Sequence, residues 1–462
     1  MTGVVSGAGR RQRRPHGEGR TWALLVLGAL AVAGASLVLV PGGLGYDPWS
    51  WMVWGREIGH LSLDTRHAAT AVKPLPMAVD TLLAAAGPAA PRLWLWVART
   101  GALLSLALAF RVGRRLGGVL AGVVAAAGLA VADQYLGALY LFGIADPLVA
   151  GAVLAAVDSH LRGRRRAAVA FLVVAGLLRP EPWLALVGYD WWLVRDQPLR
   201  RQALALLGAC TVPAVWFALD WIGARNLSRS AEAATHESQG GPLLSKVPGL
   251  ATFGETWSLM SGLVLVLFLL GTALAVRAWR RGRQPGPVLW LAAGAVGWVA
   301  VDAVLAQGRL ATGAPRYLLG GTALACVVAG CFVADVFARL RQRPPDSRLH
   351  RSAPWIVAGV LVVACLPRLV EVAGQVDRAV QHAASAEQVQ RTLPQAIAAA
   401  GGRAAILRCG RVSTGPFQVP LMAWHLRVPI QAVKVARPGT GGTVIEITPQ
   451  NTWTVRTRCS TS

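Results

Sequence analysis

Long apolar runs alternate with short polar segments along most of the chain. A helix needs about 20 apolar residues to cross a bilayer, and most of these runs approach that length. They lie at 21–41, 93–110, 116–132, 145–160, 167–178, 183–194, 202–222, 256–276, 288–306, 317–338 and 353–370. The pattern predicts an all-α polytopic membrane protein with about eleven transmembrane helices within residues 21–370.

Two of the runs, 167–178 and 183–194, are short and are separated by Arg179-Pro180-Glu181-Pro182. Proline blocks the continuation of a helix because it lacks the amide proton and clashes with the preceding turn. We therefore expect two short helices that are joined by a turn at the far face of the membrane.

Composition supports this picture, and charge adds an orientation. Only 15% of the residues are charged, whereas a soluble chain carries about 25%, and the net charge is +24. Arginines cluster between alternate runs, at 10–20, 111–115, 162–166, 195–201, 277–283 and 339–351. Such clusters mark cytoplasmic segments, whereas nucleic-acid binders carry their charge along one face. We expect a multi-pass plasma-membrane protein with a basic cytoplasmic N-terminus (1–20) and no nucleic-acid partner.

Residues 371–462 lose the apolar character of the preceding chain, and an odd number of spans places them on the extracytoplasmic side. The pattern predicts a helix at 375–400 and short strands at 403–408, 430–435, 443–447 and 452–458. A small C-terminal α/β domain is therefore expected. Cys409 and Cys459 lie in it, and two cysteines in an oxidising compartment favour a disulfide.

The first outer loop, residues 42–92, is too long for a simple connector. Asp47 follows the first span by a few positions, where a partly desolvated carboxylate suits a general base for an acceptor hydroxyl. The alternative is a helix N-cap, with Pro48 as the first helical residue. Three tryptophans follow, which would anchor the helix at the interface or line a groove for a sugar or lipid: Trp49, Trp51 and Trp54.

Cationic side chains recur at the same predicted face. Lys73, one of three lysines in the chain, precedes a Pro-Leu-Pro segment that would hold it extended towards an anion; a plain surface lysine is the alternative. Arg316 precedes the tenth span, where arginine either holds a phosphate through two parallel hydrogen bonds or extends to the membrane interface.

Three more ionisable residues fall at outer helix ends. Arg179 and Glu181 form a charged pair between two membrane helices, which is costly unless it is satisfied. The pair is therefore either part of a functional site or a structural ion pair. Asp146, before Pro147, opens the fourth span and is either a site residue or a helix start. The sequence contains no phosphate-binding glycine loop and no zinc-ligand spacing.

These features together resemble the GT-C superfamily of integral-membrane glycosyltransferases, which use polyprenyl-phosphate sugars. The resemblance covers about residues 21–370 and rests on an acid just past the first span, a later Lys-Pro element, an outer Asp, Leu-Arg-Pro-Glu and an outer Arg-Tyr. It implies that Asp47 is the general base and that Lys73, Arg179 and Arg316 bind the donor phosphate. Further candidates for the site are Tyr46, Glu57, Asp146, Glu181 and Tyr317.

Many members of the superfamily carry two adjacent acids in the first loop, whereas here Pro48 follows Asp47 and Glu57 lies ten positions on. The base assignment and a dependence on a divalent metal therefore both stay open, and no other cofactor is expected. The resemblance implies an inverting transfer of a hexose or pentose from a polyprenyl-phosphate donor to an envelope glycan, glycolipid or protein.

Two other functions compete with this one. A transporter or flippase of a lipid-linked substrate would also need many spans, but such proteins often show internal repeats and broken helices near the midplane. No repeat is evident in the sequence, and the notable charges cluster at one face. A non-catalytic membrane scaffold that displays the C-terminal domain to a partner is the third possibility.

Overall fold

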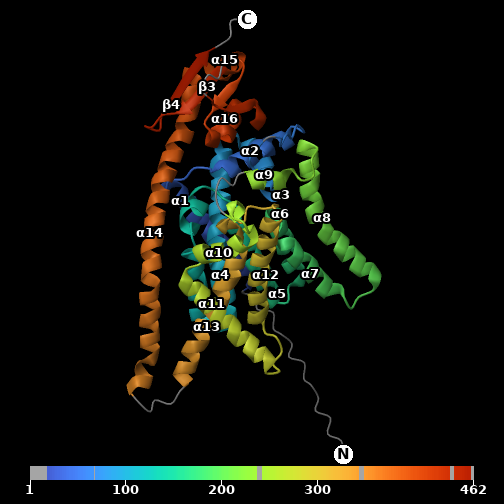
Figure 1. Cartoon of the computed structure of the whole chain (residues 1–462), viewed down its shortest axis with the longest axis vertical. Coiled ribbons are helices and arrows are strands. Elements are labelled where there is room, and N and C mark those ends of the chain that lie inside the picture. The colour runs from blue at the N-terminus through green and yellow to red at the C-terminus, as the bar shows by residue number, and fades with distance from the viewer. Residues whose placement is uncertain (1–17, 67, 237–241, 343–347, 438–441, 459–462) are drawn as a thin grey trace, which may run out of the picture.

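The computed structural model describes residues 18–66, 68–236, 242–342, 348–437 and 442–458. A body of helices occupies most of its length, and a small domain with a β-sheet caps one end (Figure 1). We call this the domain end of the molecule. The predicted fold class, helical and polytopic with a small C-terminal α/β part, is confirmed.

The helices of the body follow one another in chain order. The first are α1 (Glu18–Leu39), α2 (Tyr46–Gly59), α3 (Pro74–Leu83), η1 (Ala84–Ala89), α4 (Ala90–Ala130), η2 (Tyr135–Leu139), α5 (Asp146–Leu161), α6 (Arg165–Leu178), α7 (Pro182–Val194) and α8 (Leu199–Ala224). After these come α9 (Arg229–His236), η3 (Pro242–Leu244), α10 (Pro248–Leu259), α11 (Gly262–Arg280), α12 (Pro287–Gln307), η4 (Pro315–Leu318), α13 (Leu319–Gln342) and α14 (Arg348–Ala399).

Helix α4 reverses direction within its bounds, as the two separate apolar runs predicted. Gly118 has φ 83°, a left-handed conformation that glycine adopts without steric cost. The two arms then pack backbone to backbone: a Cβ on Gly113 would lie 2.7 Å from the carbonyl oxygen of Ala121. A Cβ on Gly122 would lie 2.5 Å from the carbonyl oxygen of Phe110. These glycines make the tight hairpin possible.

Seven helical segments of the described chain are long and apolar enough to cross a membrane. The turn between α6 and α7 is where the prolines predicted it, but these two helices and α5 are shorter than a full span. The expected run 256–276 is not one helix, because the chain breaks between α10 and α11 at Met260, which has an extended backbone. The count of eleven spans stays a prediction.

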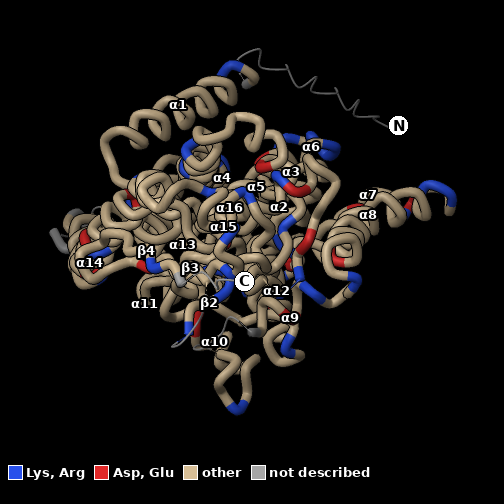
Figure 2. The backbone as a smooth tube through the Cα atoms, turned by 90° about the horizontal axis from the view of Figure 1, so that it is seen from above, with Lys and Arg blue, Asp and Glu red and all other residues tan. Residues whose placement is uncertain are grey.

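Helix α13 lies at the centre of the body, where 89% of its most apolar window is buried. It packs against α4, α11 and α12. Helices α1 and α14 and the α7–α8 pair lie at the periphery (Figure 2). Only 6% of the most apolar stretch of α14 is buried, as expected for a helix whose outer surface contacts lipid.

The first loop contains helices α2 and α3, and each of them differs from what the sequence predicted. Pro74–Leu83 is helix α3 rather than an extended segment, because Pro74 occupies a helical N-terminal position where its missing amide costs nothing. The three tryptophans of α2 are at most 3% exposed and pack inside the protein. The prediction that they anchor the helix at the membrane interface is therefore wrong.

The C-terminal part begins on α14, which runs without a break from the body to the domain end (Figure 1). It continues through α15 (Gly402–Arg408), β1 (Val412–Thr414), η5 (Pro416–Gln418), α16 (Val419–Leu426), η6 (Ile430–Ala432), β2 (Val433–Val435), β3 (Gly442–Ile447) and β4 (Trp453–Arg458). The sheet order is β2-β1-β3-β4, with β1 parallel to both neighbours and β3 antiparallel to β4.

The third and fourth predicted strands and the end of the second are confirmed, but residues 403–408 form helix α15 rather than a strand. The first strand starts later, at Val412. Cys459 lies outside the described residues, so its disulfide with Cys409 stays a prediction. The domain boundary at 370/371 also stays a prediction, since α14 passes through it.

Candidate active site at the domain end

Asp47 lies on the first turn of α2 and makes contacts that a cap would not make. The N-cap position belongs to Gly45, so the expectation that Asp47 caps the helix is wrong. Its Oδ2 accepts a hydrogen bond of 3.1 Å from Nη2 of Arg316. Its Oδ1 accepts one of 3.1 Å from Oγ1 of Thr70. The carboxylate is thus held by one cation and one hydroxyl, and its side chain remains 11% exposed.

A second, deeper group of charges surrounds Asp146 at the start of α5. Nη1 of Arg179 donates to Oδ1 of Asp146 at 3.1 Å, and the Nζ of Lys73 lies 4.0 Å from Oδ2. Arg179 also contacts Glu181 through its Nε, at 3.0 Å to both carboxylate oxygens, and through its Nη2 at 2.5 Å. The turn between α6 and α7 therefore places one guanidinium between two carboxylates.

Tyr317 joins the two groups. The guanidinium carbon of Arg179 lies 3.6 Å from the centre of its ring and that of Arg316 lies 5.3 Å away, distances typical of cation–π contacts. Lys73 interacts electrostatically with Asp47 and Arg316 as well as with Asp146 and Arg179. We call these seven residues the charged cluster: Asp47, Lys73, Asp146, Arg179, Glu181, Arg316 and Tyr317.

The cluster is buried in its lower part. Asp146, Arg179 and Glu181 are at most 4% exposed, which a charged group tolerates only when it is paired and hydrogen-bonded. Burial lowers the pKa of the Lys73 ammonium, whereas the neighbouring Asp146 carboxylate raises it. The ammonium also lies 4.9 Å from the centre of the Trp51 ring, so α2 and α3 together position it.

Two of the predicted candidates lie elsewhere. Glu57, at the other end of α2, accepts the backbone amide of Asp64 at 2.9 Å and stabilises the loop that follows. Burial raises the pKa of its carboxyl to about 7. Tyr46 lines a cavity of about 290 Å³ between the first loop and the C-terminal part.

Three residues that contribute to this end of the molecule escaped the sequence analysis. Thr70 had no signal, since threonine is common in loops. Asp302 on α12 is fully buried and faces Glu181 and Arg179. Arg99 on α4 is fully buried and donates to carbonyls at the end of α1. An ionisable residue inside an apolar run is a functional candidate by default. Applied to the sequence, this rule would have identified Asp302 and Arg99.

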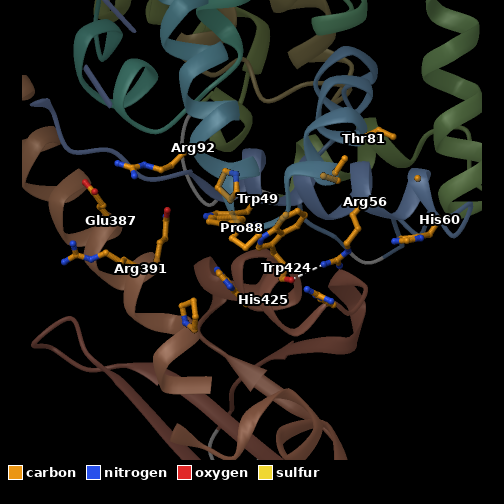
Figure 3. A pocket seen from close by; sticks show the side chains of 18 of the residues that line it. Trp49, Arg56, His60, Thr81, Pro88, Arg92, Glu387, Arg391, Trp424 and His425 are labelled. Atoms are coloured by element: carbon orange, nitrogen blue, oxygen red, sulfur yellow. Dashed lines mark hydrogen bonds between the residues drawn. The ribbon is translucent and has the colours of Figure 1, made fainter. Parts of the chain in front are cut away.

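A large cleft of about 1000 Å³ lies between the first loop and the C-terminal part (Figure 3). Trp49, two residues after Asp47, forms part of its wall. Gln390 of α14 exchanges two hydrogen bonds with the backbone of Leu44, and Glu387 accepts the amide of Gly42. These bonds fix α14 to the segment that leads into α2. Within the described ranges, no three His, Cys, Asp or Glu side chains are grouped to hold a metal.

Comparison with known proteins reveals the fold. Neither a family model nor a curated protein matches the sequence. A crystal structure of ArnT from Cupriavidus metallidurans in the apo state matches with a TM-score of 0.51 at 16% identity, over 94% of both chains. The structure of ArnT bound to undecaprenyl phosphate matches with the same score and identity over 93% of both chains. An oligosaccharyltransferase from Archaeoglobus fulgidus scores only 0.48 at 12% identity. The chain therefore shares the fold of ArnT over more than nine tenths of its length, in agreement with the fold that the resemblance implied.

Proposed function

We propose that this protein is a membrane glycosyltransferase that transfers a sugar from a polyprenyl-phosphate donor to an acceptor of the cell envelope. The observation that carries the proposal is the charged cluster, in which three cations and an accessible carboxylate from distant parts of the chain meet at one end of a membrane domain. The GT-C fold, and a neighbour whose structure contains undecaprenyl phosphate, support it.

The cations suit the donor phosphate. Arg316 is 28% exposed in its side chain and would contact a phosphate that enters from the membrane interface. Lys73 is buried but interacts electrostatically with Arg316, and its ammonium would add to the positive charge that the phosphate meets. Arg179 is held from behind by Glu181 and Asp146 and contributes positive charge without moving. As the bond between the anomeric carbon and the phosphate oxygen breaks, these fixed charges stabilise the departing phosphate.

Asp47 suits the role of general base. In this proposal its carboxylate accepts the proton of an acceptor hydroxyl while the acceptor oxygen bonds to the anomeric carbon and the phosphate leaves from the opposite side. That in-line displacement inverts the anomeric centre. Thr70 holds the second carboxylate oxygen and so fixes the orientation of the base.

The pair between Arg316 and Asp47 links the two roles. Without donor, the guanidinium donates to the carboxylate at 3.1 Å and occupies an oxygen that an acceptor hydroxyl would otherwise approach. A donor phosphate competes for the same guanidinium, and in doing so it releases Asp47 to accept the proton. Binding of the donor would thus activate the base.

The test is a transfer assay with the full-length protein in membrane vesicles and a panel of radiolabelled polyprenyl-phosphate hexoses and pentoses. The wild type is expected to form a covalent labelled product with at least one donor when an envelope extract supplies the acceptor. Asp47→Asn is expected to lower the rate about 10²- to 10⁴-fold, the usual contribution of a general base.

Asp377→Asn is the matched control, because it makes the same chemical change on an exposed position of α14. It should retain the wild-type rate. Equal rates for the wild type and Asp47→Asn would contradict the assignment of the base. Movement of the lipid-linked sugar across the vesicle membrane without a covalent product would instead show a flippase.

A further inference from the structure

A cleft of about 1000 Å³ lies between the first loop and the C-terminal part. The ends of α2 and α3, η1 and the start of α4 form its membrane-side wall. Helices α14 and α16 form the other wall (Figure 3). Its volume of about 1000 Å³ lies at the upper end of the range for small-molecule sites, so it has room for several sugar rings.

The lining is strongly basic. Four arginines contribute to it, and they come from four separate elements: Arg56, Arg92, Arg391 and Arg427. Glu387 is the one acidic residue among the lining residues, and it already accepts the amide of Gly42. A cleft with such an excess of one charge concentrates ligands of the opposite charge.

Arg56 has a second role that ties the cleft to the fold. Its guanidinium donates to the carbonyls of Trp424 at 3.0 Å and Val428 at 2.9 Å and lies 5.3 Å from the centre of the Trp424 ring. It therefore joins α2 to the end of α16 and holds the two walls at a fixed separation. Arg92, Arg391 and Arg427 are the exposed arginines of the lining, and Arg92 also donates a hydrogen bond of 3.4 Å to the carbonyl of Leu37.

Aromatic side chains line the middle of the cleft. The rings of Trp49 and Trp424 lie 6.4 Å apart, and His425 lies 5.9 Å from Trp49. Trp49 is 3% exposed, and its indole Nε1 has no acceptor in the described part of the chain. Burial lowers the pKa of His425 to about 4, so its imidazole is neutral at pH 7. An indole donor and a neutral imidazole suit the hydroxyls of a sugar.

We propose that this cleft binds an acidic saccharide, a sugar chain that carries carboxylate or phosphate groups, and presents it as the acceptor to Asp47. Arginines would pair with the acidic groups, and the aromatic rings would contact the sugar faces. Trp49 and Asp47 share the first turn of α2 but, two positions apart, lie on different faces of the helix, so an acceptor held in the cleft would reach the base around this turn. The acceptor role rests on the proposed function, whereas the binding of an acidic saccharide does not.

The experiment measures binding to the full-length protein in nanodiscs by isothermal titration calorimetry. The probes are hexagalacturonate and phosphorylated mannopentaose, with uncharged maltohexaose for comparison. We expect at least one acidic probe to bind ten times more tightly than maltohexaose. The triple variant Arg92→Gln/Arg391→Gln/Arg427→Gln should weaken that binding at least tenfold.

The matched control, Arg280→Gln/Arg281→Gln/Arg283→Gln, removes the same charge at the end of α11 that lies far from the cleft (Figure 1). It should leave binding unchanged. The proposal is overturned if no acidic probe binds more tightly than maltohexaose, or if both triple variants behave alike. It is also overturned if soluble dihexanoyl-phosphatidylglycerol binds the cleft more tightly than either acidic saccharide, because the cleft is then a lipid site.

Two readouts separate this inference from the proposed function. Asp47→Asn should bind the acidic saccharide as the wild type does, even though transfer is lost. The cleft variant should bind undecaprenyl phosphate as the wild type does, because none of its substituted arginines belongs to the charged cluster. Normal transfer by a cleft variant that no longer binds acidic saccharide would overturn the acceptor role alone.

Discussion

At the scale of single residues, the charged cluster divides into a buried part and an accessible part. The Asp146–Arg179 pair has side-chain exposures of 1% and 5%, whereas the Asp47–Arg316 pair has 11% and 28%. A buried charge that loses its partner keeps its full desolvation penalty, but a more exposed one is hydrated instead. The first pair should therefore govern stability and the second should govern chemistry.

This division predicts different effects for the same chemical change. Asp146→Asn should lower the free energy of unfolding by about 3–5 kcal/mol, because Lys73 loses its nearest buried carboxylate and Arg179 keeps only Glu181. Asp47→Asn should change stability by less than about 1 kcal/mol. Thermal unfolding in detergent followed by circular dichroism measures both. Equal destabilisation by the two substitutions would show that the division is wrong.

Glu57 provides a pH-dependent prediction. Burial raises the pKa of its carboxyl to about 7, so the folded protein disfavours the ionised form and loses stability as pH rises from about 5 through 7. Glu57→Gln cannot ionise, and its side-chain oxygen can still accept the amide of Asp64. Its melting temperature should exceed that of the wild type by a margin that grows from pH 5 to pH 8.

Glu255→Gln, on a half-exposed position of α10, is the control for this measurement. The difference in melting temperature between this variant and the wild type should stay constant from pH 5 to pH 8. A margin for Glu57→Gln that shrinks as pH rises would contradict the raised pKa.

The sequence pointed to Asp47, Lys73, Arg179 and Arg316 because each is an unusual residue at the end of an apolar run. It could not show that Arg316 pairs with Asp47, since 269 positions separate them and only the packing of α2 against the body brings them together. The choice between general base and N-cap for Asp47 also needed coordinates, because an aspartate before proline is compatible with both roles.

At the scale of elements, glycine and proline decide where the helices start and reverse. The hairpin within α4 depends on glycines that let two backbones touch, and α3, α5, α7, α10 and α12 each begin with a proline in the first two positions. The sequence predicted the α6–α7 turn by this reasoning. It missed α3, where two prolines suggested an extended segment although the first occupies a favourable helical position.

The hairpin predicts a sharp contrast between two glycines. Gly113→Val should lower the free energy of unfolding by about 1–3 kcal/mol, because its Cβ would meet the carbonyl oxygen of Ala121. Gly188→Ala on α7 is the control, since a Cβ there meets nothing within 4 Å and alanine favours the helix. Thermal unfolding in detergent tests both, and a tolerated Gly113→Val would contradict the close packing.

The C-terminal elements were harder to predict than the membrane helices. The segment 403–408 is short, and its apolar and polar residues show little alternation. Its local pattern therefore does not distinguish a buried helix from a strand. Their assignment as helix α15 depends on contacts with α14. Long apolar helices need no such context, because the bilayer requires their backbone hydrogen bonds to close within the segment.

At the scale of the whole molecule, the charged cluster, the cleft and the C-terminal part all lie at the domain end. The arginine-rich ends of α11 and α13 lie at the opposite end (Figure 1). We propose that the domain end is extracytoplasmic and the arginine-rich end cytoplasmic, as the positive-inside rule requires. Composition alone predicted the membrane class, but which helices surround the site could be learned only from the three-dimensional fold.

This orientation predicts the reactivity of cysteines that are introduced at the two ends. Phe417→Cys, on an exposed position of the C-terminal part, should react with a membrane-impermeant maleimide in intact cells. Arg283→Cys should react only after the membrane is permeabilised. The wild type serves as the blank for the native cysteines. Reaction of both variants in intact cells, or of Arg283→Cys alone, would contradict the orientation.

The most direct test of the account is a cryo-electron microscopy structure of the full-length protein with undecaprenyl phosphate. We expect the phosphate within hydrogen-bond distance of Lys73 and Arg316, with Asp47 released from the Arg316 guanidinium and open to the cleft. A phosphate bound away from these cations, with the Asp47–Arg316 pair unchanged, would contradict the central claim that the charged cluster is a sugar-transfer site.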